Sequence, residues 1–219
     1  MKTDVLLSIM AIASALFLVG GSTYAYFNDV EVAEGNTFTT GTLNLKVGDD
    51  DECTETMTFS NLKPGDSNDS AAIWLISNEG SIAGNLSVKI DNIINNENVI
   101  TEPERESGDT TVGGELGAYL RLVFWMDVDQ SGDWTAGDYC LLSNGTTESH
   151  GNIVSLDAVY DTLNNFNETW PGVQNSVAGG ADFGQFIVAY TLLEGVGNTI
   201  QSDNCTFNIS FTLDQDRSP

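Results

Sequence analysis

Short apolar segments with a period of two, separated by turn residues, constrain the fold of this chain more than any other feature. The clearest one lies near the C-terminus, where Phe207, Ile209, Phe211 and Leu213 alternate with polar residues. Alternating segments also occur at 43–47, 57–59 and 86–90, and further apolar segments of strand length occur at 72–77, 120–126 and 183–193. Because successive side chains of a strand point to opposite faces, these segments predict strands. Strands divided by glycine, proline and asparagine turns favour an all-β fold, a jelly-roll-like antiparallel β-sandwich.

Two segments depart from the strand pattern. Residues 95–114 are polar and charged and indicate a long loop. In residues 155–170 the apolar side chains are spaced as on one face of a helix, at Leu156, Val159, Tyr160, Leu163 and Phe166. This spacing predicts a surface helix there. We therefore expect one or two short helices in the loops of one domain, residues 37–219.

The N-terminus has the organisation of a secretory signal peptide, residues 1–25. Lys2 precedes an apolar run at 5–19, and Thr23 and Ala25 are spaced like the small residues of a signal-peptidase site. The alternative is a permanent membrane anchor, but the run is shorter than the ~20 residues that span a bilayer. No basic cluster follows it. We expect cleavage after Ala25, secretion, and membrane contact only through the uncleaved leader.

The charge of the chain excludes some partners. It has 32 acidic and 7 basic residues and a formal net charge of −25. Such a surface repels nucleic acid and anionic lipid, so we expect no nucleic-acid partner, and it attracts cations. It also stays soluble where salt screening is strong. A salty habitat and a merely well-solvated surface are both compatible with this composition.

The cysteines are Cys53, Cys140 and Cys205. In an exported protein they predict one disulfide with one cysteine left over, and their spacing does not say which two pair. No CxxC motif is present. The sequence therefore gives little support to a zinc or redox site.

The chain is also rich in N-glycosylation sequons. These Asn-x-Ser/Thr motifs lie at Asn68, Asn85, Asn144, Asn167, Asn204 and Asn208. They are acceptors only in a host that glycosylates its secreted proteins. They are compatible with a glycan-coated, extracellular surface.

Residues 127–138 follow the register of an EF-hand calcium loop. Oxygen ligands fall at positions 1, 3 and 5, a glycine at 6, a backbone carbonyl at 7, a hydroxyl at 9 and a carboxylate at 12: Asp127, Asp129, Ser131, Gly132, Asp133, Thr135 and Asp138. Ser131 is neutral and Asp138 is shorter than the usual glutamate, which favours modest affinity. The flanks look like strands. We expect a structural calcium in a loop between strands; the alternative is an acidic Asp/Gly hairpin.

Three stretches of the N-terminal half resemble a known family. They are LVGGSTYAYFND at 18–29, TFTTGTLNL at 37–45 and NLKPGD at 61–66. In this order they resemble the TasA and camelysin (CalY) family, whose leaders are of the SipW-dependent type. The resemblance covers about residues 16–90. It implies a jelly-roll domain, a SipW-type signal peptidase as processing partner, and a subunit of extracellular filaments in a biofilm matrix or on the cell surface.

The resemblance also implies how the subunits join. In the fibres of this family, the N-terminal segment of one subunit completes a sheet of the next. Residues 26–36 can serve as this donor strand, with Tyr26, Val30 and Val32 on one face and Phe27 on the other. Such head-to-tail contact produces a homopolymer. From the residues alone, an ordinary first strand within its own domain remains the alternative.

Some members of the family are described as metallopeptidases. This sequence has one histidine, His150, and no HExxH motif, whereas a zinc protease needs about three ligands and a general base. We therefore expect no enzymatic activity. A monomeric surface adhesion module on the same fold and a camelysin-like metallopeptidase remain the alternatives, because a sandwich hosts many functions.

Overall fold

The computed structural model of the protein describes residues 41–49, 53–110 and 112–216. The predicted signal peptide (1–25) and the predicted donor strand (26–36, with Tyr26, Phe27, Val30 and Val32) lie outside the described residues. Among the residues that are described, no helix combines the length and apolar character that crossing a bilayer requires.

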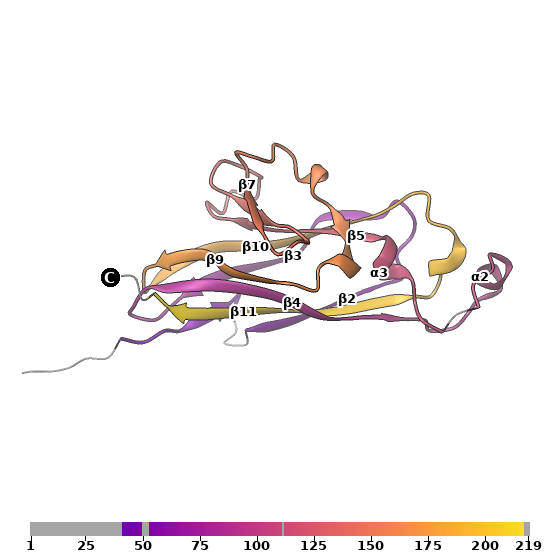
Figure 1. Ribbon diagram of the computed structural model, residues 1–219, viewed down its shortest axis with the longest axis horizontal. Helices are drawn as coiled ribbons and strands as arrows, with labels where there is room; N and C mark the ends of the chain where they lie inside the picture. Colours follow the sequence, from indigo (N-terminus) through magenta and orange to yellow (C-terminus); the bar gives the residue numbers. More distant parts are fainter. Residues whose placement is uncertain (1–40, 50–52, 111, 217–219) are drawn as a thin grey trace, which may run out of the picture. The chain divides into compact units, whose positions relative to one another are not determined.

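The described residues form two antiparallel sheets (Figure 1). The strands are β1 (Leu45–Val47), β2 (Thr54–Ser60), β3 (Ser67–Asn78), β4 (Gly84–Asn96), β5 (Leu120–Asp127), β6 (Tyr139–Leu141), β7 (Thr147–Ser149), β8 (Asp161–Thr162), β9 (Thr169–Val177), β10 (Ala181–Leu192) and β11 (Asn204–Gln215). The larger sheet has the order β1-β3-β10-β5-β6-β7, with β8 beside β5. The smaller sheet has the order β2-β11-β4-β9.

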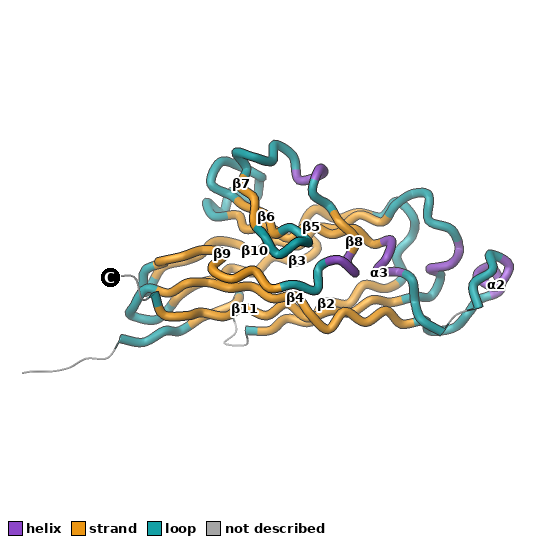
Figure 2. Tube along the Cα trace, in the orientation of Figure 1, coloured by secondary structure: helices purple, strands orange, loops and turns teal. Residues whose placement is uncertain are grey.

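The chain passes back and forth between the sheets, which makes the topology that of a jelly roll. Strands β2, β4, β9 and β11 lie in the smaller sheet, and β3, β5 and β10 lie in the larger one. The predicted all-β sandwich is therefore confirmed. The helical elements are short and lie in the connections (Figure 2): α2 (Glu102–Glu106), α3 (Leu116–Tyr119), and the 3-10 turns η1 (Leu156–Ala158), η2 (Leu163–Asn165) and η3 (Asn198–Ile200).

The main core lies between the sheets and follows the alternation of the sequence. On β11, Cys205, Phe207, Ile209 and Phe211 are buried, while the residues between them are half-buried and polar. On β5, Leu122, Phe124 and Met126 point into the same core. The ring of Phe124 packs edge-on against Phe166 and Phe207, with centroids 4.9 and 6.0 Å away. Burying such rings is the main stabilising term of a sandwich.

A second, smaller core covers the outer face of the larger sheet. It contains Val123 and Trp125 of β5, Ile187 and Ala189 of β10, and Cys140 of β6. Its cover comes from the excursion between β5 and β8, through Trp134, Leu142, Ile153, Leu156, Val159 and Tyr160. This excursion explains why β5 is a nearly continuous apolar run, because both of its faces are buried.

The surface helix predicted at 155–170 is wrong. The segment consists of η1, β8 and η2, and then enters β9. The reason is that its apolar residues serve two different cores. Leu156 and Tyr160 pack on the outer core, whereas Leu163 and Phe166 are buried in the main core. Their helical spacing does not correspond to one apolar face.

The segment 95–114, predicted as a long loop, contains the end of a strand and a short helix. Strand β4 continues to Asn96, and α2 lies within the segment. In contrast, the turn at 61–66 is as predicted. Gly65 has φ +87°, the backbone N–H of Asp66 donates to the Lys63 carbonyl at 2.9 Å, and the Asp66 carboxylate accepts from the Lys63 N–H at 2.8 Å. This turn connects β2 to β3.

The structure shows no bond between Cys140 and Cys205, and the predicted disulfide stays a prediction. Cys140 and Cys205 are free buried thiols, in the outer core of the larger sheet and on the inner face of β11. Cys53 lies beside Phe211, whose N–H donates to the Cys53 carbonyl at 2.7 Å. Phe211 is six residues from Cys205, about 20 Å along the strand. Bridging needs Cα atoms within about 7 Å.

These thiols allow a first prediction. Burial raises the pKa of Cys140 to about 11 and that of Cys205 to about 12. Only the thiolate is nucleophilic, so neither residue should be alkylated by iodoacetamide in the folded protein near about pH 8. Peptide mass spectrometry should find both carboxamidomethylated after unfolding in urea. Native labelling of either thiol at the unfolded rate would contradict the described packing.

Candidate functional site

The predicted cation loop closes the hairpin between β5 and β6. Met126 pairs with Tyr139, so Asp127 and Asp138 lie across the neck of the loop, directly beyond the last strand pair. Both aspartates have an exposed fraction of 0%. Two acids are therefore held side by side by the sheet itself, away from water, at the position where the chain leaves β5 and returns to β6.

Three of the predicted ligands come together. The carboxylate oxygens of Asp127, Asp129 and Asp138 lie within 4.8 Å of one another. Backbone N–H groups orient the two buried carboxylates. Asp127 accepts from Ser131 at 3.1 Å and from Gly132 at 2.7 Å, and Asp138 accepts from Val128 at 2.9 Å and from Thr135 at 2.7 Å. Gly132 has φ +80°, which allows the chain to turn back around the acids.

The other predicted ligands have different roles. The Thr135 hydroxyl donates to Asp129 at 3.1 Å and lies 3.3 Å from Asp138, next to the three acids. The Ser131 hydroxyl lies 3.2 Å from the carbonyl of Asp133, to which it can donate. The side chain of Asp133 is exposed, as the register predicts for a residue that offers only its carbonyl. The structure thus brings three of the predicted ligands together, and calcium binding by the loop stays a prediction.

The electrostatics of the three acids differ. Burial raises the pKa of Asp127, and the charge of Asp138 raises it further, against the backbone hydrogen bonds that lower it. Hydrogen bonds from Ser131 and Thr135 lower the pKa of Asp129. The buried charge of Asp127 is the one that a cation would relieve most, because a dication compensates both desolvation and repulsion.

Two supporting residues were missed in the sequence. Gly184 of β10 lies at a bulge with φ +121°, and a Cβ there would stand 2.5 Å from the carbonyl oxygen of Asp127. Only glycine allows β10 to approach the neck of the loop this closely. Trp134 packs edge-on against Trp125 at 5.7 Å, and its indole N–H donates to the Ile153 carbonyl at 2.9 Å. Neither contact leaves a local signal in the sequence.

His150 lies next to the loop, since its backbone N–H donates to the Asp138 carbonyl at 2.9 Å, but its side chain is not part of the acidic group. Its ring packs against Trp134, with centroids 5.5 Å apart. Within the described residues, the groups able to hold a metal contain carboxylates alone, without histidine or cysteine. Oxygen-only donors suit calcium or magnesium, whereas catalytic zinc takes histidine or cysteine ligands. The residues present do not fit a catalytic zinc.

A second feature is the outer edge of β3. Strand β1 pairs only with residues 76–78 of β3, and the Gly48 N–H donates to the Leu75 carbonyl at 2.8 Å. Farther along, residues 67–74 have no strand partner on this side within the described part of the chain. Ile73 and Leu75 are exposed here. An unpaired edge of this kind is a template for another strand.

Of the two edge strands of the smaller sheet, β2 and β9, the second is protected. Strand β9 ends the smaller sheet, and it contains Pro171, two bulges in its pairing with β4, and positive φ values at Gly172 and Ser176. Proline and bulges interrupt the row of N–H and C=O groups that another chain would need. The edge of β3 contains no proline over 67–74, and its one irregularity is the register shift against β10 between Asn68 and Ala72.

The sequons fall into two groups. The asparagines on exposed positions are Asn68, Asn144 and Asn167. The asparagines in β4 and β11 are half-buried, and their side chains form hydrogen bonds. Asn85 bonds to the Ser176 N–H, Asn204 to the side chains of Asn96 and Asn98, and Asn208 to the side chain of Thr56. Glycosylation stays a prediction, and the exposed group offers the accessible acceptors.

Comparison with known proteins places the chain in a family. No solved structure matches it. It is 42% identical over 66 residues to the "Major biofilm matrix component" of Bacillus subtilis (strain 168); the match spans 30% of this chain and 24% of that protein. The profile of the family described as camelysin metallo-endopeptidase matches residues 1–216. The resemblance to the TasA and camelysin family is thereby confirmed, and this chain belongs to the camelysin metallo-endopeptidase family.

Proposed function

We propose that this chain is a secreted structural subunit of extracellular filaments, in a biofilm matrix or on the cell surface, and that it is not an enzyme. The observation that carries the proposal is the unpaired edge of β3 at 67–74, in a chain that resembles a biofilm matrix component. A sheet edge without a partner among the described residues can accept a further strand.

Residues 26–36 are the proposed donor. An extended segment of this length reaches about 35 Å, and the open edge of β3 is about 26 Å long. The donor would add to β3 of a neighbouring subunit and leave its own β3 for the next one. Because this contact is head-to-tail and does not close, it propagates a fibre. A SipW-type signal peptidase would release the donor by cleaving after Ala25.

Calcium in the loop of Asp127, Asp129 and Asp138 is proposed to make the subunit rigid. The loop closes β5 and β6, and Trp134 attaches it to the outer core. A cation would neutralise acids that the fold holds within 4.8 Å of one another.

The experiment is negative-stain electron microscopy of two purified proteins, one beginning at Tyr26 and one at Thr37, each in calcium and in chelator. We expect filaments from the first and monomers from the second, with the same circular dichroism spectrum for both. Loss of filaments in chelator would support the role of the loop. Folded monomers from both proteins would overturn self-assembly and favour a monomeric adhesion module.

The family description favours a second candidate, a metallo-endopeptidase. It predicts proteolysis that a chelator abolishes. We place it second because the metal-holding groups of the described residues contain only carboxylates, and because His150 packs on Trp134 outside them. Chelator-sensitive cleavage of casein by the purified chain, lost on His150→Ala, would reverse this ranking.

A further inference from the structure

A second group of acids gathers beyond the ends of β4 and β11, where the chain crosses from β4 through α2 to α3 (Figure 1). Glu97 follows β4, Glu104 lies on α2, and Asp203 precedes β11. Asp109 and Glu115 lie between α2 and α3. These acids are separate from the loop of Asp127, and they come from four places in the sequence.

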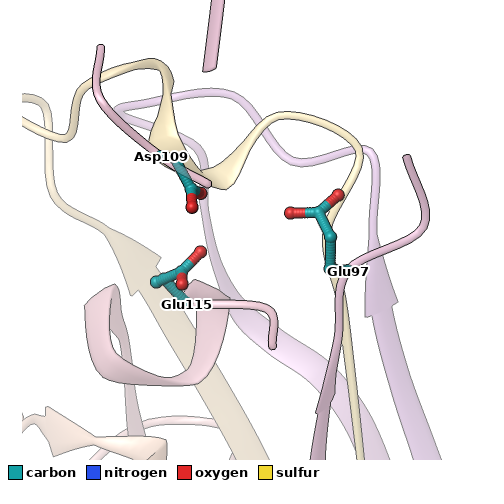
Figure 3. Close-up of side chains that lie close together, drawn as sticks. All are labelled: Glu97, Asp109 and Glu115. Carbon is teal, nitrogen blue, oxygen red and sulfur yellow. The ribbon is translucent and has the colours of Figure 1, made fainter. Parts of the chain in front are cut away.

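The carboxylates converge. Oxygens of Glu97, Glu104 and Asp203 lie within 4.8 Å of one another, and so do oxygens of Glu97, Asp109 and Glu115. Figure 3 shows the carboxylates of the latter three pointing toward a common space. Because Glu97 belongs to both sets, the five acids form one group.

Two of these carboxylates are buried with one oxygen left without a partner. Glu104 has an exposed fraction of 0%; one of its oxygens accepts from the Thr101 N–H, at the N-cap of α2, and Oε1 has no hydrogen-bond partner. Asp203 has an exposed fraction of 2%; its Oδ2 accepts from the N–H groups of Glu115 (2.7 Å) and Leu116 (3.1 Å), and Oδ1 has none. Leaving a buried acceptor unsatisfied costs about 1–3 kcal/mol, and more for a charged group.

The described residues provide no basic partner for three of these acids. Within the described residues, neither Glu97, Glu104 nor Asp203 forms a salt bridge. Burial raises the pKa of Asp203 to about 6, and the charges of Glu97 and Glu115 contribute to this rise. Yet the fold orients the carboxylates inward through specific N–H donors. A group of like charges held in this way calls for a positive ligand.

We propose that Glu97, Glu104 and Asp203 bind a divalent cation of the calcium type, with Asp109 and Glu115 completing its oxygen shell. Hard dications take six to eight oxygens, and carboxylates of either mono- or bidentate geometry supply them. The unpartnered Oε1 of Glu104 and Oδ1 of Asp203 would be ligands. The ion would attach α2 and the crossing segment to the ends of β4 and β11. This proposal stands independently of the filament function and of the loop at Asp127.

The test is calcium binding by equilibrium dialysis of the secreted chain, at a free calcium concentration that saturates the wild type. Glu104→Gln keeps an amide oxygen for the Thr101 N–H and removes the charge. We expect it to bind one calcium fewer per chain than the wild type. Glu102→Gln, which changes an exposed acid on the same helix, should bind as many as the wild type.

A second variant and a second measurement distinguish the loss of a calcium ligand from misfolding of the variant. Asp203→Asn keeps an oxygen for the N–H groups of Glu115 and Leu116 and should also lose one calcium. In chelator both variants should melt at or above the wild-type temperature, because a repulsive charge is gone; in calcium they should melt below it. Asp129→Ala should remove a different calcium, and the double variant Asp129→Ala/Glu104→Gln should lose both. Undiminished binding by folded Glu104→Gln and Asp203→Asn would overturn this site while leaving the loop intact.

Discussion

Ile73→Pro is expected to abolish filaments while leaving the monomer folded. Ile73 lies on β3 in the unpaired stretch and is 50% exposed. The carbonyl of Leu75 accepts from the Gly48 N–H, so the backbone groups of Leu75 point toward the open edge and away from β10. Backbone groups alternate along a strand, and those of Ile73 therefore point the same way. Proline at this position removes an N–H that only an added strand would use.

The size of the effect follows from the backbone contact that is lost. An unmade hydrogen bond that leaves its partner unsatisfied costs about 1–3 kcal/mol, which weakens subunit affinity by roughly 5- to 150-fold. The proline ring adds steric exclusion at the same edge. Because every contact of the fibre is the same, each one is weakened. Electron microscopy and sedimentation at a concentration where the wild type is fully polymerised should show monomers.

Ile73→Thr is the matched control. It removes the same exposed apolar side chain but keeps the backbone N–H and the branched Cβ that favours strands. It should still form filaments. If Ile73→Pro polymerises as the wild type does, with an unchanged melting temperature, the edge of β3 is not the acceptor. If both variants fail, the side chain of Ile73 rather than the edge carries the contact.

Removing one ligand of the cation loop should abolish most of the calcium-dependent stability. A ligand present at about 100 times its Kd stabilises the folded state by about 2.7 kcal/mol. For a domain of this size that corresponds to roughly 5–10 °C in Tm. We expect wild-type protein to show a rise of this order between chelator and calcium. Asp129→Ala should lose most of that rise.

Asp133→Ala serves as the control for net charge. Each substitution removes one carboxylate from the same loop, but the side chain of Asp133 is exposed and Asp133 offers the cation only its carbonyl. Differential scanning calorimetry should therefore show a calcium-induced rise close to that of the wild type for Asp133→Ala. Equal rises for Asp129→Ala and the wild type would mean that the acids close a hairpin without binding an ion there.

The parts of the fold that could be predicted are those that depend on residues close together in the sequence. The buried positions of β11 and the turn at Lys63 and Gly65 could be predicted from the sequence. Each depends only on residues within one short segment. Strand β9 was missed because Pro171 and Gly172 argue against a strand. Strand β9 lies at a sheet edge, where the N–H that proline lacks is not needed for pairing. The sequence of the segment alone does not indicate this position.

The two acidic groups differ in the same way: one depends on neighbouring residues and the other on residues far apart in the sequence. The convergence of Asp127, Asp129 and Asp138 was predictable because the three acids lie in one short loop, and the structure brings their carboxylate oxygens within 4.8 Å of one another. Nothing in the sequence connects Glu97 and Glu104 with Asp203, because about a hundred residues separate Asp203 from the other two. Only the return of β11 beside β4 brings them within reach.

The sequence by itself determined that this chain makes an all-β sandwich, because period-two alternation commits each strand to a buried and a solvated face. It also determined that Asp127, Asp129 and Asp138 come together, because the loop that contains them is local. Only the tertiary structure decided that residues 155–170 divide between two cores instead of forming a helix, that Cys140 and Cys205 lie in two different cores, and that β3 has no strand partner over 67–74 within the described residues. These outcomes depend on which distant segments occupy the same space, and no short stretch of sequence encodes that.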